Sequence, residues 1–208
     1  SIMPFFTSAL SAAPPAGPRT RIAVIAAVAT GALGVTLGIP AGAPALSTVG
    51  GTLFIGGLVG LGWATFAPLR HALGPRRGLV ALAYGSAIAN VVAGASLATL
   101  LVAGWGPVAG QWGALRPAHA WLNVFGFVSL VIAGTLLHLY PTVAGSRMAK
   151  HPTATIAIRG LAAGAPLAAL GHALSSGALA ILGATATFAG ALALLAYVGR
   201  AWRARAGW

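Results

Sequence analysis

Histidine is the side chain of this sequence that is best suited to binding a metal or a cofactor. The 208 residues include five histidines, but no aspartate, glutamate or cysteine. Without carboxylates there is no general acid–base pair, no carboxylate cage for Ca²⁺ or Mg²⁺, and no acidic proton relay inside a membrane. Without thiols there is no thiolate site or disulfide. Neutral imidazole is a usual ligand of haem iron, copper and zinc, so the histidines define the candidate chemistry.

The elements that must position these histidines are long apolar segments. The chain is 58% hydrophobic and 6% charged, whereas soluble proteins are about 45–50% apolar and roughly 25% charged. Six segments have roughly the 20 residues that cross a bilayer. The sequence therefore predicts an all-α integral membrane protein, a bundle of six transmembrane helices. The predicted helices cover about 22–39, 49–69, 78–102, 118–140, 153–173 and 177–198.

Composition outside these helices sets the boundaries of the regions. Residues 1–18 are rich in proline, alanine and serine and are predicted to form an irregular or interfacial arm. The transmembrane domain is expected over residues 19–200, followed by a basic cytoplasmic tail, 201–208. A very short loop around Ser175 and Ser176 makes the last two helices antiparallel neighbours. Small residues four apart predict close helix packing at three places: Gly34 with Gly38, Gly56 with Gly60, and Gly160 with Gly164 and Ala168.

Basic residues predict the orientation of the bundle. The net charge is +12, and every lysine and arginine except Arg116 falls on one side of the alternating helices. Because positive loops stay in the cytoplasm, both termini are expected on the cytoplasmic side of a bacterial inner membrane. The same cations are expected to contact anionic lipid headgroups. They form no separate basic domain, so nucleic-acid binding is not predicted.

The expected depth in the membrane divides the histidines into an outer and an inner group. His119 opens the fourth helix and His172 closes the fifth, so both lie near the outer surface. These two residues are the predicted cofactor and metal ligands, for haem iron or copper. His138 is 19 residues after His119, roughly 28 Å of helix rise, and lies on the inner side with His71 and His151. The alternative is that each histidine is an interfacial residue that bonds a carbonyl or water.

Two asparagines are expected in the polar interior of the bundle. Asn123 follows His119 by one turn, on the same helix face, and Asn90 lies in the middle of the third helix. A buried amide in a membrane must find hydrogen-bond partners, so both side chains should face other helices. They either hold helices together or support a site at His119.

A family resemblance enters through residues 115–148. The arrangement of Arg116, Pro117 and His119 before Phe125 and Gly126 resembles a helix of the haem–copper oxidase subunit I superfamily and its short relatives. There the histidine ligates haem, which the resemblance implies for His119. The segment is more similar to the membrane domain fused to some bacterial multicopper oxidases and copper nitrite reductases. That similarity rests on His119, Leu122, Asn123, Gly126, Gly134, Thr135, Pro141, Thr142, Arg147 and Met148.

The departures from that family limit what the resemblance implies. The relatives often carry a second histidine two residues after the first, where this chain has Trp121. The adjacent histidine pair of the oxygen-reducing oxidases and a cupredoxin domain are both missing from the sequence. Catalysis by this chain alone is therefore not predicted.

Three functions follow from these observations. The first is a membrane subunit of a respiratory or copper-linked electron-transport assembly, which anchors membrane or periplasmic redox partners and binds haem b or copper near the outer face. The second is an accessory, scaffolding subunit without any cofactor. The third is a small transporter or channel, lined by Asn90 and Asn123 and kinked at Pro166. The absence of intramembrane acids and of inverted repeats argues against the third.

Overall fold

The computed structural model describes residues 3–4, 8, 15–67, 78–146 and 151–204, and every regular element in these ranges is helical. Six helical spans are long and apolar enough to cross a membrane. This confirms the six-helix, all-α prediction for the described part of the chain. Eight residues on which the sequence predictions draw lie outside the described residues: Arg70, His71, Arg76, Arg77, Arg147, Met148, Lys150 and Arg205.

Proline or a capping side chain marks the N-terminus of four of the spans. Proline occupies the first turn of α2, α3 and α8, where its missing N–H costs nothing. Ser176 caps α9 by accepting from the Leu179 amide. The elements are α2 (Pro18–Gly38), α3 (Pro44–Phe66), α4 (Leu79–Val102), the short α5 (Gly106–Ala109), α6 (Trp112–Ala120), η2 (Trp121–Val128), α7 (Ser129–Val143), α8 (Pro152–Ala173) and α9 (Gly177–Arg203).

The fourth span differs from its prediction in length and in form. It runs without a break from Trp112 to Val143, so it starts before the predicted residue 118 and passes Pro141, where it was expected to end. Its middle, η2, is a π-helix, which the apolar pattern did not predict. The Asn123 side chain donates to the His119 carbonyl at 2.8 Å. In an ordinary α-helical turn, the backbone N–H of Asn123 would donate to this same carbonyl. The side chain competes with it for that acceptor, which favours the wider i→i−5 hydrogen bonds of a π-helix.

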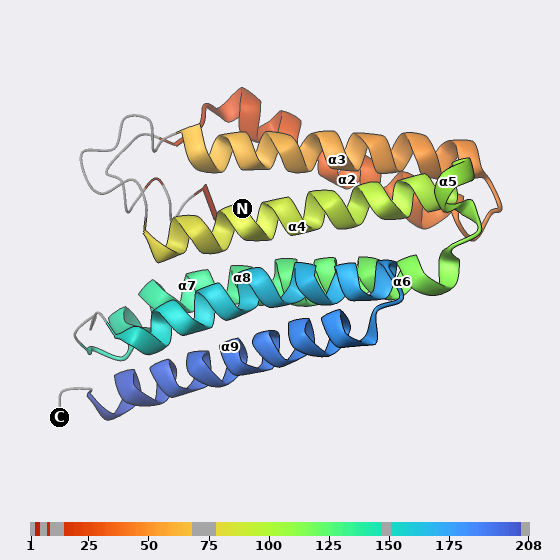
Figure 1. The fold of residues 1–208 in the computed structure, drawn as a ribbon. Helices are drawn as coiled ribbons and strands as arrows, with labels where there is room; N and C mark the ends of the chain where they lie inside the picture. Colours follow the sequence, from red (N-terminus) through yellow and green to blue (C-terminus); the bar gives the residue numbers. More distant parts are fainter. Residues whose placement is uncertain (1–2, 5–7, 9–14, 68–77, 147–150, 205–208) are drawn as a thin grey trace.

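The spans are arranged as a row of antiparallel helices (Figure 1). The continuous α6–η2–α7 span, α4 and α8 pack against one another in the centre. The α2–α3 hairpin packs onto α4 from one side, and α9 packs onto α8 from the other. The buried core lies mainly between α4, α7 and α8, and Met3 of the arm joins it at 3% exposure. This part of the arm therefore packs against the bundle.

The α8–α9 turn is tight because Ser175 adopts a left-handed conformation, with φ of 52°. The next amide, of Ser176, then bonds back to the Gly171 carbonyl at 2.7 Å, a geometry typical of helix ends. The two helices consequently lie side by side and antiparallel, as predicted.

Small residues mediate the closest helix contacts, but not all of those predicted. A Cβ atom on Gly34 would stand 2.9 Å from Gly50, and one on Gly160 would stand 2.9 Å from Gly190. Gly56, by contrast, has nothing within 4 Å, and its neighbour Gly57 meets Val28 instead. Of the predicted Gly56–Gly60 pair, only Gly60 therefore packs closely, because a Cβ atom there would stand 3.0 Å from Val24 of α2, whereas Gly56 is exposed.

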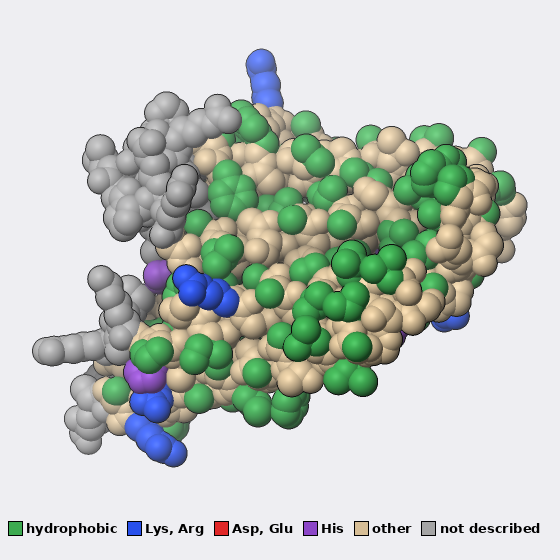
Figure 2. Space-filling model, viewed as in Figure 1, with side chains coloured by type: hydrophobic (Ala, Val, Ile, Leu, Met, Phe, Trp, Pro, Cys, Tyr) green, Lys and Arg blue, Asp and Glu red, His purple; other side chains and the backbone are tan. Residues whose placement is uncertain are grey.

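Large apolar side chains cover the outside of the bundle. Ile22, Ile181 and Leu195 are each more than 65% exposed, and apolar side chains spread over the face in Figure 2. The Lys and Arg side chains visible there lie mostly toward the end of the view that holds the C-terminus, with one at the opposite end. A surface of this kind suits a multi-pass membrane protein, with lipid rather than water around its middle.

Candidate functional site

His119 lies at the end of α6, where the side chain reaches across to α4. Its Nδ1 is 2.8 Å from the backbone carbonyl oxygen of Gly94. A carbonyl oxygen can only accept, so Nδ1 must carry the proton and donate. Nε2 is then unprotonated and keeps its lone pair. The fold therefore selects one tautomer of His119 and leaves Nε2 as the basic nitrogen.

Asn123 lies one turn further along the same helix and packs against the His119 ring. Its Nδ2 donates to the His119 carbonyl and lies 3.1 Å from Nδ1 and 3.5 Å from Nε2 of the ring. Because a carbonyl cannot donate, the amide nitrogen must be the atom at that carbonyl. The amide oxygen of Asn123 is left as a further acceptor.

Asn90 and Asn123 form a reciprocal contact between α4 and η2. Asn90 is buried at 6% exposure, and a Cβ on Gly126 would stand 2.6 Å from its Cγ. In the opposite direction, a Cβ on Gly94 would stand 3.0 Å from Cγ of Asn123. Each asparagine thus lies over a glycine of the facing helix. Asn90 also donates to the Ser86 carbonyl at 2.8 Å within α4.

His119 and Asn123 line a cavity of about 130 Å³ between the α2–α3 hairpin, α4 and the fourth span. Its walls are mainly apolar, with Val35, Phe54 and Val102 among them. Two hydroxyls also line it, but Ser47 donates to Ala43 and Thr99 donates to Ala95. The remaining polar groups are the second N–H of the Asn123 amide, which lies 3.5 Å from Nε2 of His119, and the lone pairs of Nε2 and of the Asn123 amide oxygen. The acceptors in the cavity therefore suit a cation or a ligand that donates a hydrogen bond.

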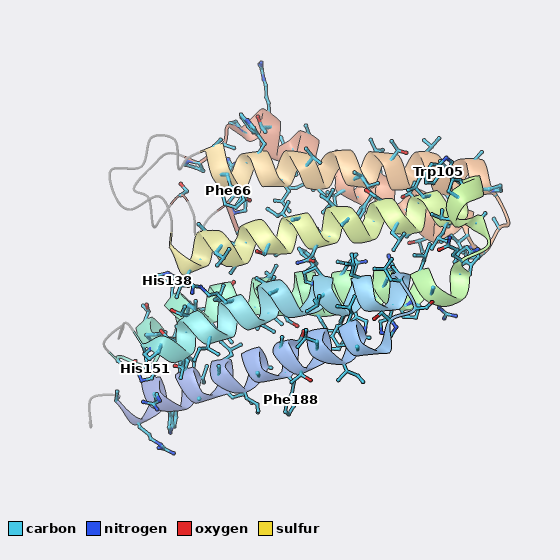
Figure 3. The ribbon with its side chains drawn as sticks, viewed as in Figure 1. Phe66, Trp105, His138, His151 and Phe188 are labelled. Carbon is cyan, nitrogen blue, oxygen red and sulfur yellow. The ribbon has the colours of Figure 1, made fainter. Side chains whose placement is uncertain are left out.

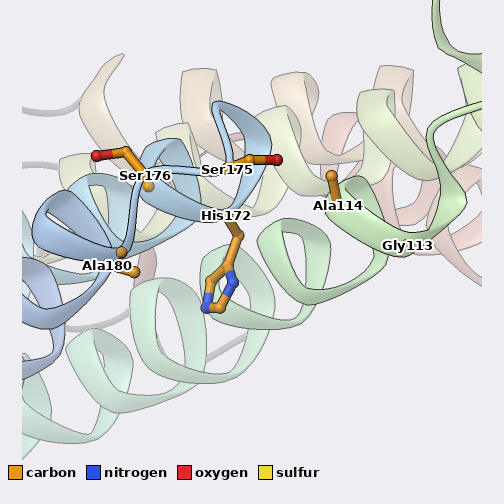
Figure 4. A pocket seen from close by; sticks show the side chains of 8 residues that line it. Gly113, Ala114, His172, Ser175, Ser176 and Ala180 are labelled. Atoms are coloured by element: carbon orange, nitrogen blue, oxygen red, sulfur yellow. The ribbon is translucent and has the colours of Figure 1, made fainter.

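His172 lies in a different place. It lines an open cavity of about 340 Å³ with Ser175, Ser176 and several small residues of α6, α8 and α9. Figure 4 shows its ring pointing away from both serine hydroxyls. The ring of Trp121 stacks with it at 6.4 Å between centroids. The aromatic contact on His172 therefore comes from Trp121.

The structure does not bring His119 and His172 into one cavity. His119 and Trp121 are two residues apart, so their side chains leave the helix roughly 200° apart, one toward α4 and the other toward His172. The His119 cavity is also smaller than the roughly 300–1,000 Å³ of typical small-molecule pockets. A haem held between these two imidazoles does not fit this arrangement.

The remaining histidines have separate surroundings. His138 and His151 lie toward the same end of the bundle (Figure 3). His151 contacts Thr153 and Arg200, whereas Nδ1 of His138 is buried without a hydrogen-bond partner among the described residues. Within those residues, no three histidines gather around a point that could hold a metal. His71 lies outside the described residues.

Gly94 is a site residue that was not predicted from the sequence, and Gly126 was singled out there only through the family resemblance. Their signal was present as spacing, because Gly94 follows Asn90 by four residues and Gly126 follows Asn123 by three. An asparagine and a glycine one turn apart on each of two helices can interlock.

Comparisons of the chain with protein-family models, curated proteins and solved structures found no match.

Proposed function

We propose that this chain is a membrane subunit of a respiratory or copper-linked redox assembly. In this proposal it anchors membrane or periplasmic redox partners and offers His119 as a ligand near the outer face. The two termini lie in the cytoplasm of a bacterial cell, because only Arg116 of the twelve basic residues falls on the other side. The same cations draw the chain to anionic headgroups on the cytoplasmic side.

One observation carries the proposal, namely the bond from His119 Nδ1 to the Gly94 carbonyl at 2.8 Å. Histidines that ligate metals usually donate their other ring nitrogen to a carbonyl or carboxylate, which fixes the ring and makes the ligating nitrogen more basic. His119 has this arrangement, with Nε2 left for a metal. Copper suits an imidazole nitrogen, and its remaining ligands would come from a partner subunit.

Metal content and the visible spectrum test this proposal together. The full chain would be purified from cells supplied with haem and copper, both alone and with any subunits that copurify. We expect stoichiometric copper that His119→Ala abolishes and His172→Ala preserves, because only His119 has its Nδ1 held by a carbonyl. A Soret band lost only in His119→Ala would instead identify the metal as haem iron, in a cavity enlarged on binding.

A subunit without a cofactor is the second candidate, favoured by the way α4 and η2 interlock. The hydrogen bonds of His119 and Asn123 also hold these helices together, so helix packing by itself would account for them. In that case the purified assembly contains no metal that depends on His119, while the redox partners still copurify with the chain. Recovery of the chain without any redox partner would contradict both candidates.

A further inference from the structure

A histidine and an arginine join the start of α8 to the end of α9. Nη1 of Arg200 lies 2.8 Å from Nε2 of His151, although the two residues are 49 positions apart in the sequence. His151 immediately precedes α8, and Arg200 lies in the last turn of α9. Arg203 follows one turn later and is exposed. We call His151, Arg200 and Arg203 the basic cluster.

Hydrogen-bond chemistry shows that this cluster has more donors than acceptors. A guanidinium group only donates, so Nε2 of His151 must accept, and Nδ1 carries the proton. That proton is donated to Oγ1 of Thr153, which is 2.8 Å away. The backbone N–H of Thr153, which points at Nδ1 from 3.2 Å and caps α8 there, has the imidazole as its acceptor only in the other tautomer. In the opposite tautomer, Arg200 would lose its acceptor instead.

No acidic side chain of this protein can supply the missing acceptor. The chain has twelve lysines and arginines and no aspartate or glutamate, so the anion that balances the basic cluster must come from another molecule. Exposed apolar side chains lie beside the cluster. Leu192, two turns before Arg200 on α9, is 50% exposed, and Ile156 of α8 is 53% exposed. An anion bound to the basic cluster would therefore have exposed apolar side chains of α8 and α9 near it.

We propose that the basic cluster binds the phosphate group of an anionic phospholipid. The phosphate oxygens accept from Arg200 and Arg203, and planar guanidinium groups can meet them through two parallel hydrogen bonds. The acyl chains then run along the exposed apolar side chains of α8 and α9. This proposal requires that the helices span a bilayer, but it does not depend on the redox function.

Lipid titration followed by native mass spectrometry tests the proposal on the full chain in detergent. Phosphatidylglycerol and phosphatidylcholine would be compared for the wild-type chain, Arg200→Gln, Arg200→Lys and the matched control Arg116→Gln. Arg116 is exposed at the opposite end of the bundle, so its substitution removes the same charge elsewhere. Circular dichroism would verify that each variant retains its helices.

We expect the wild-type chain to prefer phosphatidylglycerol, and Arg200→Gln to weaken its binding about fivefold, the effect of one basic residue near an anionic surface. Arg200→Lys should fall between the two, and Arg116→Gln should match the wild type. Equal weakening by Arg200→Gln and Arg116→Gln would reduce the effect to overall charge and overturn the proposal. Inorganic phosphate at matched ionic strength should compete only weakly. If it competes fully and phosphatidylglycerol shows no preference over phosphatidylcholine, the site binds free phosphate and the lipid proposal fails.

Discussion

Two helix contacts in this bundle both use glycines but are made in different ways. Where α8 meets α9, glycines allow backbone to touch backbone, with Gly183 against Ala168 and Gly160 against Gly190. Where α4 meets η2, the glycines accommodate side-chain amides, with Asn90 over Gly126 and Asn123 over Gly94. At these glycines the first contact depends on shape, whereas the second places hydrogen-bonding amides and a histidine at the glycines themselves.

The two contacts differ in the side chains that they place between the helices. In a membrane, apolar helices gain little from the hydrophobic effect when they associate, so close packing and polar bonds hold them together. In the α8–α9 contact these glycines pack backbone against backbone, and the polar pair that joins the two helices, His151 and Arg200, lies at its end. The α4–η2 contact fixes His119 as part of its packing, so the same bonds that join the helices also prepare the candidate site.

The largest effect is expected at the α8–α9 contact. Gly183→Ala places a methyl group against the backbone of Ala168, which cannot move aside as a flexible side chain would. We expect a loss of about 1–3 kcal/mol, as for other overpacked interiors, measured as unfolding of the purified chain in detergent and denaturant. Gly199→Ala is the matched control on the same helix, because nothing lies within 4 Å of that position. Equal stability of the two variants would show that the helices separate at little cost.

A smaller loss of stability, with a functional consequence, is expected at the α4–η2 contact. Asn123→Ala removes the donor to the His119 carbonyl and leaves a gap over Gly94. We expect a loss of about 1 kcal/mol, within the range found for polar contacts between membrane helices. Helicity near Trp121 should also change, because the π-helix loses the side chain that competes for that carbonyl. Amide hydrogen exchange over residues 119–128 would report this, and an unchanged pattern would refute our explanation of η2.

The smallest effect is expected further along the same face of α4. Tyr84 and Thr135 are hydrogen-bonded through their hydroxyls at 3.0 Å, and both are buried. Tyr84→Phe keeps the ring and removes one interhelical bond, for which about 0.6 kcal/mol is the average cost in a membrane. The same denaturation assay would measure it, with Tyr140→Phe on the fourth span as the comparison. A loss larger than that of Asn123→Ala would reverse our order of the two polar contacts.

The sequence predicted the spans better than it predicted the site. Hydropathy located six helices, and the short connection at Ser175 and Ser176 gave the α8–α9 pairing. Hydropathy averages over many residues, however, and a π-helix depends on which donor reaches one carbonyl, that of His119. The pairing of His119 with His172 used depth alone. Which sides of their helices the two residues occupy depends on how the helices rotate against their neighbours, and a single sequence does not encode this in its hydropathy.

The central claim is that the fold holds His119 in one tautomer, with Nδ1 protonated and Nε2 free. Nitrogen-15 magnetic resonance of the histidine-labelled full chain in lipid bilayers tests this directly, with the His119 signals assigned by their loss in His119→Gln. The account predicts a protonated, pyrrole-type Nδ1 and an unprotonated Nε2, with metal addition shifting only the Nε2 signal. A protonated Nε2 with an unprotonated Nδ1 would mean that the Gly94 bond does not form, and would contradict the account.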